Sequence, residues 1–195
     1  MRDIVLGMSV SLDGYIEGPG RDISWHRVDE ELHRYFNAEL AGMSAFMDGR
    51  VTHELMVSVW PTVDADPDCG ETMAEFAGIW RNMPKIVFSR TLENTAENTD
   101  WNTTIVRDVV VEDILALKAQ PGGDMSLGGA GLAARFMELD LVDEFRVYVH
   151  PVLIGGGKPL FPAAGRAVAL RLVETRTFGN GVVMLRYRRA SEAAS

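Results

Sequence analysis

The sequence predicts an α/β protein with a mainly parallel central sheet, flanked by helices, and an antiparallel C-terminal hairpin. Its 195 residues fit one domain, and 47% hydrophobic with 24% charged residues is an ordinary globular composition. Strand-like and helix-like segments alternate along most of the chain, which is typical of a parallel sheet. Residues 170–188 instead alternate apolar and polar side chains around Gly179-Asn180-Gly181, a strong hairpin signal. We therefore expect a single domain over 1–188 and a disordered tail over 189–195.

Two patterns predict the individual elements in order. Apolar, β-branched runs predict strands, and apolar residues three or four apart predict helices. Asp29 is expected to cap one helix and Thr52 to cap a short one. The expected strands are 4–10, 44–47, 85–89, a segment around 105–106, 125–127 and 145–154. The expected helices are 30–40, a short one from 52, 71–80, 111–118 and one that follows the glycines after 127 and ends near 139.

Charge and residue content exclude several classes of function. The 19 basic and 28 acidic residues give a net charge of −9, which argues against a nucleic-acid partner. No apolar run is long enough to span a membrane, and the N-terminal residues do not resemble a signal peptide, so we expect a cytoplasmic protein. Cys69 is the single cysteine and no HExxH is present, so no metal site is expected. With no GxSxG nucleophile either, hydride transfer from a nicotinamide suits the remaining chemistry.

The strongest local signal is the glycine-rich turn Gly128-Gly129-Ala130-Gly131, followed by Leu132. A predicted strand meets a predicted helix here, and the backbone N–H groups and dipole of a helix N-terminus favour an anion such as a pyrophosphate. A tight turn without any ligand explains the glycines equally well. The segment is not a full GxGxxG and it comes late in the chain, which argues against a standard Rossmann domain.

Two other strand ends carry residues suited to phosphate oxygens. Gly49-Arg50-Val51-Thr52 offers a turn, a guanidinium and a hydroxyl, and Ser89-Arg90-Thr91 has the chemistry that a 2′-phosphate needs. A solvated arginine beside a capped helix is the plainer interpretation of each segment. Three such strand ends in one sheet are more telling than any one of them, because ligands bind beyond the carboxyl ends of parallel strands.

Carboxylates near the predicted cleft have two interpretations. Glu30 and Glu31 follow Trp25 and could supply a proton if buried, or they could simply add favourable charge at a helix N-terminus. Asp13 could be catalytic or could form an Asx turn. These alternatives stay open from the residues alone.

Motifs along residues 1–188 resemble the dihydrofolate reductase-like superfamily. Within it, the chain is similar to the family of the C-terminal reductase domain of the riboflavin-biosynthesis deaminase/reductase, and most of all to its stand-alone bacterial members. The motifs are MSVSLDGYI (8–16), GRVTHE (49–54), WP (60–61), PKIVFSRTL (84–92), LGGAGL (127–132), LVDE (141–144) and PVLIGGGKPLF (151–161).

The resemblance implies a three-layer dihydrofolate reductase-like fold that binds NADPH. By position, Gly49, Arg50 and Thr52 would contact NADPH at its diphosphate and on its 2′-phosphate side. The pyrophosphate would lie over Gly128, Gly129, Ala130, Gly131 and Leu132. The adenosine 2′-phosphate would be flanked by Ser89, Arg90 and Thr91, and the nicotinamide would be bordered by Ser9 and Ile16. The substrate would meet Trp25, in a loop over the active site, and Asp13. The proton donor would be Glu30 or Glu31.

The resemblance also implies an NADPH-dependent reductase of a small heterocycle, either a pterin or a pyrimidine such as 5-amino-6-(5-phosphoribosylamino)uracil, acting as a homodimer. An NADP(H)-binding sensor or interaction protein without turnover is the alternative. The substrate half departs from the family pattern. Thr52 is followed by His-Glu-Leu-Met where the riboflavin reductases carry Thr-x-x-x-Asp-Asp-Pro, and Leu127 stands where they tend to place an acid. The zinc motifs of the deaminase half, HxE and PCxxC, do not occur in these 195 residues.

Overall fold

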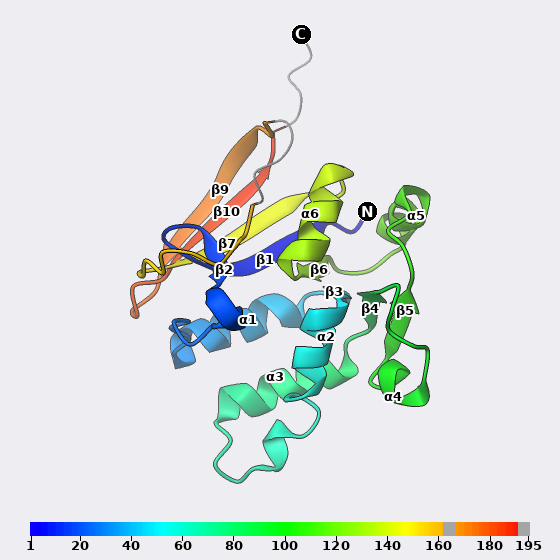
Figure 1. Ribbon diagram of the computed structural model, residues 1–195, viewed down its shortest axis with the longest axis horizontal. Coiled ribbons are helices and arrows are strands. Elements are labelled where there is room, and N and C mark those ends of the chain that lie inside the picture. The colour runs from blue at the N-terminus through cyan, green and yellow to red at the C-terminus, as the bar shows by residue number, and fades with distance from the viewer. Residues whose placement is uncertain (162–166, 191–195) are drawn as a thin grey trace.

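The central feature of the computed structural model, which describes residues 1–161 and 167–190, is an eight-stranded sheet. Its strand order is β5-β4-β3-β6-β1-β7-β10-β9 (Figure 1). The first six strands in this order are mutually parallel, and β10 joins β7 and β9 in antiparallel pairs. The predicted fold class is confirmed. The strands are β1 (Ile4–Ser11), β3 (Ala45–Gly49), β4 (Lys85–Phe88), β5 (Thr103–Val106), β6 (Met125–Gly128), β7 (Glu144–His150), β9 (Leu170–Thr177) and β10 (Val183–Arg189).

Helices cover both faces of the sheet because the strands present apolar side chains on both sides. On one face, α5 and α6 pack against a cluster that includes Leu6, Met47 and Phe136. On the other, α3 packs through Phe76 and Trp80 against Phe46, and α1 packs through Leu32 against β7 and β10. The helices are α1 (Glu30–Ala41), α2 (Arg50–Val57), α3 (Glu71–Asn82), α4 (Ala96–Thr99), α5 (Val111–Ala119) and α6 (Ala130–Glu138), with 3-10 turns η1 (Pro19–Arg21) and η2 (Val63–Ala65).

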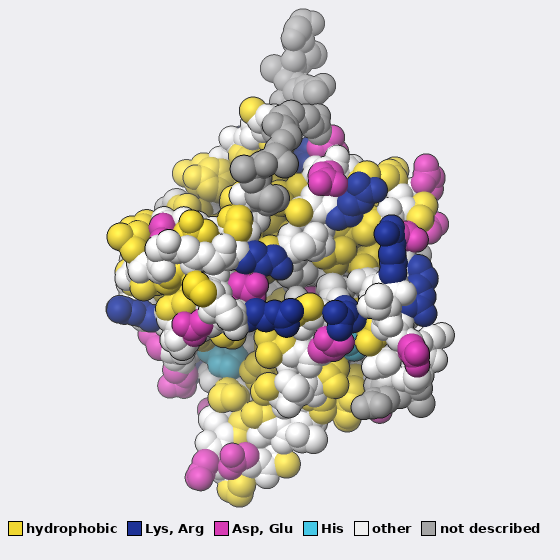
Figure 2. Space-filling view, in the orientation of Figure 1, with side chains coloured by type: hydrophobic (Ala, Val, Ile, Leu, Met, Phe, Trp, Pro, Cys, Tyr) yellow, Lys and Arg dark blue, Asp and Glu magenta, His cyan; other side chains and the backbone are white. Residues whose placement is uncertain are grey.

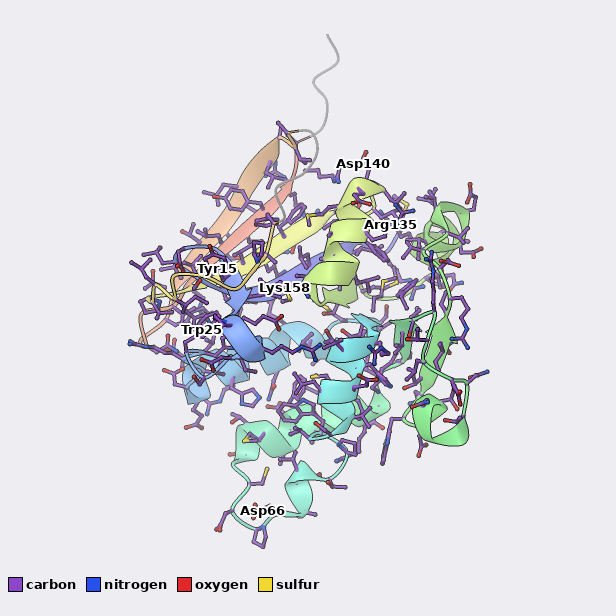
Figure 3. The ribbon with its side chains drawn as sticks, viewed as in Figure 1. Tyr15, Trp25, Asp66, Arg135, Asp140 and Lys158 are labelled. Atoms are coloured by element: carbon purple, nitrogen blue, oxygen red, sulfur yellow. The ribbon has the colours of Figure 1, made fainter. Side chains whose placement is uncertain are left out.

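A second, two-stranded sheet joins distant loops at one end of the main sheet. In it, β2 (Tyr15–Glu17) pairs antiparallel with β8 (Lys158–Pro159). Tyr15 and Lys158 lie close together in Figure 3, with Trp25 at the same end of the molecule. This pairing holds the chain that leaves β1 against the loop that leaves β7.

The structure corrects some expected element boundaries. Helix α2 begins at Arg50 with Gly49 as its N-cap, so Thr52 lies inside the helix and does not cap it. The strand expected over 145–154 ends at His150, and the following residues form a loop around Gly155 and Gly157, both at positive φ. Strand β10 runs through Arg189, and residues 191–195 of the expected tail lie outside the described residues. No helix in the described part of the chain is both long and apolar enough to cross a bilayer.

Candidate functional site

The carboxyl ends of β3 and β6 form one tight junction. Asp48 pairs in register with Gly128, and a Cβ on Gly128 would lie 2.4 Å from Asp48 Oδ1. Gly129 has a φ of +82°, and a Cβ on it would lie 2.6 Å from Thr52 Oγ1. The side chains of Asp48 and Thr52 therefore leave no room for a Cβ at either position, so these two glycines are explained without a ligand. Gly131 is different, because it is exposed and a Cβ there would meet open space.

Two helices begin at this junction. Helix α6 starts after Gly129 and α2 starts after Gly49, and neither N-cap makes a side-chain hydrogen bond. A Cβ on Gly49 would lie 3.9 Å from Leu132 Cβ, so the two N-termini are neighbours. Two adjacent helix N-termini provide free N–H groups and positive dipole ends, which together suit a doubly charged anion such as a diphosphate.

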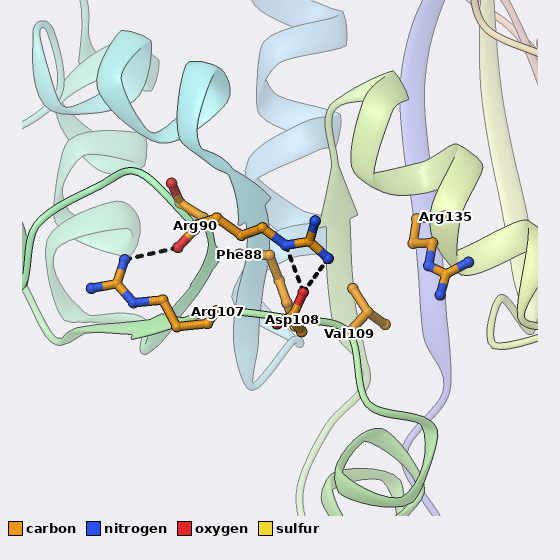
Figure 4. A pocket seen from close by; sticks show the side chains of 7 residues that line it. Phe88, Arg90, Arg107, Asp108, Val109 and Arg135 are labelled. Carbon is orange, nitrogen blue, oxygen red and sulfur yellow. Dashed lines mark hydrogen bonds and ion pairs between the residues drawn. The ribbon is translucent and has the colours of Figure 1, made fainter.

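A pocket of about 320 Å³ opens beyond the ends of β4 and β5. Three guanidinium groups and one carboxylate line it (Figure 4), and Figure 2 shows basic side chains gathered on this face around α6. The lining residues are Phe88, Ser89, Arg90, Arg107, Asp108, Val109 and Arg135. The excess of positive charge and the planar hydrogen-bond forks of arginine suit a phosphate monoester.

The three arginines of this pocket are held differently. Arg90 is 81% exposed in its side chain and donates from Nε to Asp108 at 2.7 Å. Arg107 donates to the backbone carbonyls of Ser89 and Leu92, so it fixes the loop after β4. Arg135 faces the pocket from α6 and pairs with Glu138 at 3.1 Å. Arg90 and Arg135 are thus the two that can turn toward a bound anion.

Apolar packing connects β2 to the start of α6. Ile16 is buried in one cluster with Ala130, Val147 and Leu160. Ser9 is half-buried on the adjoining part of β1. The structure therefore brings Ile16 to the glycine turn, as it does Gly49 and Thr52. Thr91 is exposed, donates its N–H to Ser89 Oγ, and does not line the pocket.

The loop after β2 is docked on the end of β7 by a histidine and tryptophan cluster. His150 is fully buried and its Nδ1 accepts the N–H of Arg27 at 3.0 Å. The His26 ring stacks on His150 with centroids 5.3 Å apart, and Trp25 contacts both rings edge-on. Burial, and to a lesser degree the nearby His26 and Arg27, lowers the pKa of His150 to about 4. The neutral imidazole is therefore the form that holds this loop at neutral pH.

The expected proton-donor region is not buried. The Glu30 side chain is 68% exposed and pairs with Arg34, and that of Glu31 is 49% exposed and accepts the N–H of Gly179. Both lie in the first turn of α1, where their charge favours the helix dipole. Glu30 and Glu31 were expected to supply a proton only if they were buried, and neither of them is.

Asp13 clamps two loops together. Its carboxylate accepts the N–H groups of Ile154 and Gly155, the latter at 2.8 Å. A hydrogen bond from the Ser11 hydroxyl and these two N–H groups hold the pKa of Asp13 below its usual range, against a smaller effect of burial. Its partners are thus both local, in Ser11, and distant in sequence, in Ile154 and Gly155.

Sequence reasoning missed Arg107, Arg135 and Asp48. Arg107 follows strand β5 as Arg90 follows β4, so the same strand-end rule would have found it. Arg135 is an ordinary helix residue whose position over the pocket comes from packing of α6. Asp48 is the single charged residue in the buried strand β3, a signal that was present in the sequence. Among the described residues, no group of three His, Cys, Asp or Glu side chains could hold a metal ion.

Comparisons with known proteins agree over nearly the whole chain. Residues 2–184 match the family model of the RibD C-terminal domain. The Uncharacterized protein YyaP of Bacillus subtilis (strain 168) is 37% identical over 187 residues, covering 95% of this chain and 94% of the relative.

Two solved structures share the fold at lower identity. A protein of Shewanella sp. PV-4, provisionally assigned to riboflavin biosynthesis, superimposes with a TM-score of 0.74 at 23% identity, covering 98% of this chain and 100% of that one. The diaminohydroxyphosphoribosylaminopyrimidine deaminase/5-amino-6-(5-phosphoribosylamino)uracil reductase of Thermotoga maritima gives 0.67 at 17% identity, covering 97% of this chain and 57% of that one. The fold is therefore dihydrofolate reductase-like, and this chain belongs to the RibD C-terminal domain family.

Proposed function

We propose that this protein is an NADPH-dependent reductase that transfers a hydride to a small heterocyclic substrate. The arginine-lined pocket carries the proposal, because it lies beyond the strand ends on the same face as α6, the helix that starts at the glycine turn. A dinucleotide phosphorylated on its adenosine ribose needs both features, a diphosphate site and a separate monoester site. Membership in the RibD C-terminal domain family supports the same activity.

The residues present fit this cofactor. The N-termini of α2 and α6 would hold the diphosphate, and Arg90 and Arg135 would hold the 2′-phosphate. Ser9 and Ile16 would border the nicotinamide, which when bound supplies the hydride. The loop that carries Trp25 would exclude water from the reacting end. The substrate is then a planar ring, such as a pterin or a riboflavin-pathway pyrimidine.

One observation favours a second candidate function. Glu30 and Glu31 are exposed, so the first turn of α1 presents no buried acid where a reductase of this fold would need one. An NADP(H)-binding sensor or interaction protein without turnover has no such need. The two candidates share the cofactor site and differ only in whether a substrate is reduced.

Thermal unfolding with NADPH, NADP+ and NADH tests the cofactor. Ligand at one hundred times its Kd stabilises a native protein by roughly 2.7 kcal/mol, so we expect NADPH and NADP+ to raise the Tm by several degrees and NADH to raise it less. An equal effect of NADH would refute the role of the arginine pocket, and no effect of any dinucleotide would refute the proposal. NADPH oxidation with added pterins and pyrimidines then separates the reductase from the sensor.

We also propose that the protein is a homodimer that pairs through β9. All eight residues of this edge strand are exposed, and Leu170, Leu172 and Val173 are 39–50% exposed. An edge strand with uncovered apolar side chains is a site of pairing with another chain. Light scattering is expected to give twice the chain mass of 21.5 kDa, and Leu172→Lys to give a folded monomer by circular dichroism. A monomeric wild-type protein at about 50 μM would exclude this dimer, because a stable one has a Kd near or below 1 μM.

A further inference from the structure

The carboxyl group of Asp48 borders the proposed diphosphate site. Asp48 is 4% exposed, and its Oδ1 lies against Gly128, immediately before the start of α6. It also immediately precedes Gly49, the N-cap of α2. The structure shows no hydrogen bond or ion pair between this carboxyl group and any described residue. A buried, unpartnered acid thus occupies the junction where both helix N-termini meet.

The charged groups around Asp48 do not neutralise it. The positive charge of Lys85 on β4 acts on Asp48 from a distance, but its Nζ donates to the carbonyls of Trp80, Met83 and Trp101. Burial raises the pKa of Asp48 to about 7, and Lys85 opposes this shift only in part.

The other titratable neighbours belong to α2. His53 is buried, and desolvation and Lys85 lower its pKa, so it is neutral at pH 7. Arg50 is exposed and pairs with Glu54 at 3.0 Å. From α6, residues 129–134 contribute no titratable side chain. Two groups near this junction therefore change charge near neutral pH: Asp48 itself, and Lys85, whose pKa burial lowers to about 8 against the opposing effect of Asp48. Only Asp48 lies against Gly128, and Asp48→Asn separates its proton from that of Lys85.

We propose that Asp48 takes up one proton from solvent when the diphosphate of the cofactor binds at this junction. This inference rests on the proposed function. An ionised carboxylate and a diphosphate would compete for the same two helix N-termini, and the burial of the Asp48 carboxyl group weakens the solvent screening of their repulsion. Binding of NADPH or NADP+ with one proton converts the carboxylate to the neutral acid, and no other bond changes. Cofactor affinity is thereby linked to pH, and the bound complex holds a proton inside the site.

The linkage gives a measurable pH dependence. In the pH range where Asp48 is ionised in the free protein and protonated in the complex, the Kd for the cofactor rises by about tenfold per pH unit. We expect this dependence for NADP+ between pH 8 and pH 9 in the wild-type protein. We expect less than about a twofold change for Asp48→Asn, which keeps the shape of the side chain but cannot ionise.

Calorimetry of NADP+ binding at pH 8 in HEPES and in Tris measures the proton directly, because the two buffers release different heat on ionisation. The wild type is expected to take up close to one proton and Asp48→Asn none. The 2′-phosphate is already a dianion at this pH, with a second pKa of about 6, so it contributes no uptake. His53→Gln is the matched control, and it should take up as much as the wild type.

The outcomes are distinct. Tight NADP+ binding by the wild type without proton uptake overturns the inference and leaves the proposed function standing. Uptake that is lost in His53→Gln and kept in Asp48→Asn also overturns it. Failure of NADP+ to bind the wild type at all overturns the proposed function, and with it the role of Asp48.

Discussion

Replacing Arg90 by alanine is expected to weaken NADPH binding by about 10- to 100-fold and to leave NADH binding nearly unchanged. A hydrogen bond to a charged group contributes roughly 1.5–3 kcal/mol, and 1.4 kcal/mol corresponds to a factor of ten. Arg90 is exposed and pairs only with Asp108 among the described residues, so it is free to exchange that carboxylate for a phosphate. Fluorescence titration of both cofactors measures the two dissociation constants.

Arg34→Ala is the matched control for Arg90→Ala. Arg34 is also an exposed arginine with one acidic partner, Glu30, and it lies on α1 away from the pocket lining. Its loss should change neither dissociation constant. Arg107 is a poor choice for this test because it holds the carbonyls of Ser89 and Leu92, and its removal would disturb the loop itself. Equal losses for NADPH and NADH in Arg90→Ala would place the 2′-phosphate elsewhere.

The fold followed from local patterns in the sequence because those patterns reflect burial. Strands buried on both faces are continuous apolar runs, and the hairpin has a turn that only glycine-rich segments form easily, with Gly181 at a φ of +87°. The start of α2 was misplaced at Thr52 because a capping side chain is a local preference. Here the glycine before Arg50 serves as the N-cap, and Thr52 packs against Gly129.

The site was only partly predictable, for a different physical reason. Glycine turns and arginines at strand ends are local, so Gly128 and Arg90 could be found from the sequence. Burial of a carboxylate is set by the tertiary packing around it. The acids at Glu30 and Glu31 therefore could not be separated from surface acids before the structure showed them exposed, whereas Asp48, in an apolar strand, proved to be the buried one.

The second large effect is expected from Glu144, which organises three arginines on β7 and β10. Glu144 is fully buried, and it accepts from Arg146 at 2.6 Å and from Arg186 and Arg188 at 2.8 Å each. Removing one partner of a buried ion pair costs about 3–5 kcal/mol. We expect the lower end of this range, because Arg146, Arg186 and Arg188 each keep a second acidic partner, namely Glu39, Glu174 and Asp3. Glu144→Ala should therefore lower the free energy of unfolding by about that amount, as measured by urea denaturation at pH 7.

Two variants separate the buried charge from simple loss of contacts. Glu174→Ala removes an exposed acid that faces Arg186 at 3.6 Å, and it should cost less than about 1 kcal/mol. Glu144→Gln keeps an acceptor oxygen and removes only the charge, so its cost should fall between the two. A Glu144→Ala protein within about 1 kcal/mol of the wild type would show that the arginines are satisfied by solvent.

Lowering the pH is expected to reduce the free energy of unfolding of the wild-type protein through the same cluster. Burial alone would raise the pKa of Glu144, but the hydrogen bonds from Arg186, Arg188 and Arg146 outweigh it and hold the pKa below its ordinary value. The unfolded chain then binds the proton first as the pH falls. The stabilisation is complete well above the ordinary glutamate pKa of about 4.3 and is lost as the pH falls through the lower pKa of the folded state. Glu144→Ala should lack this part of the acid sensitivity, because the group that titrates is gone while the three arginines stay charged.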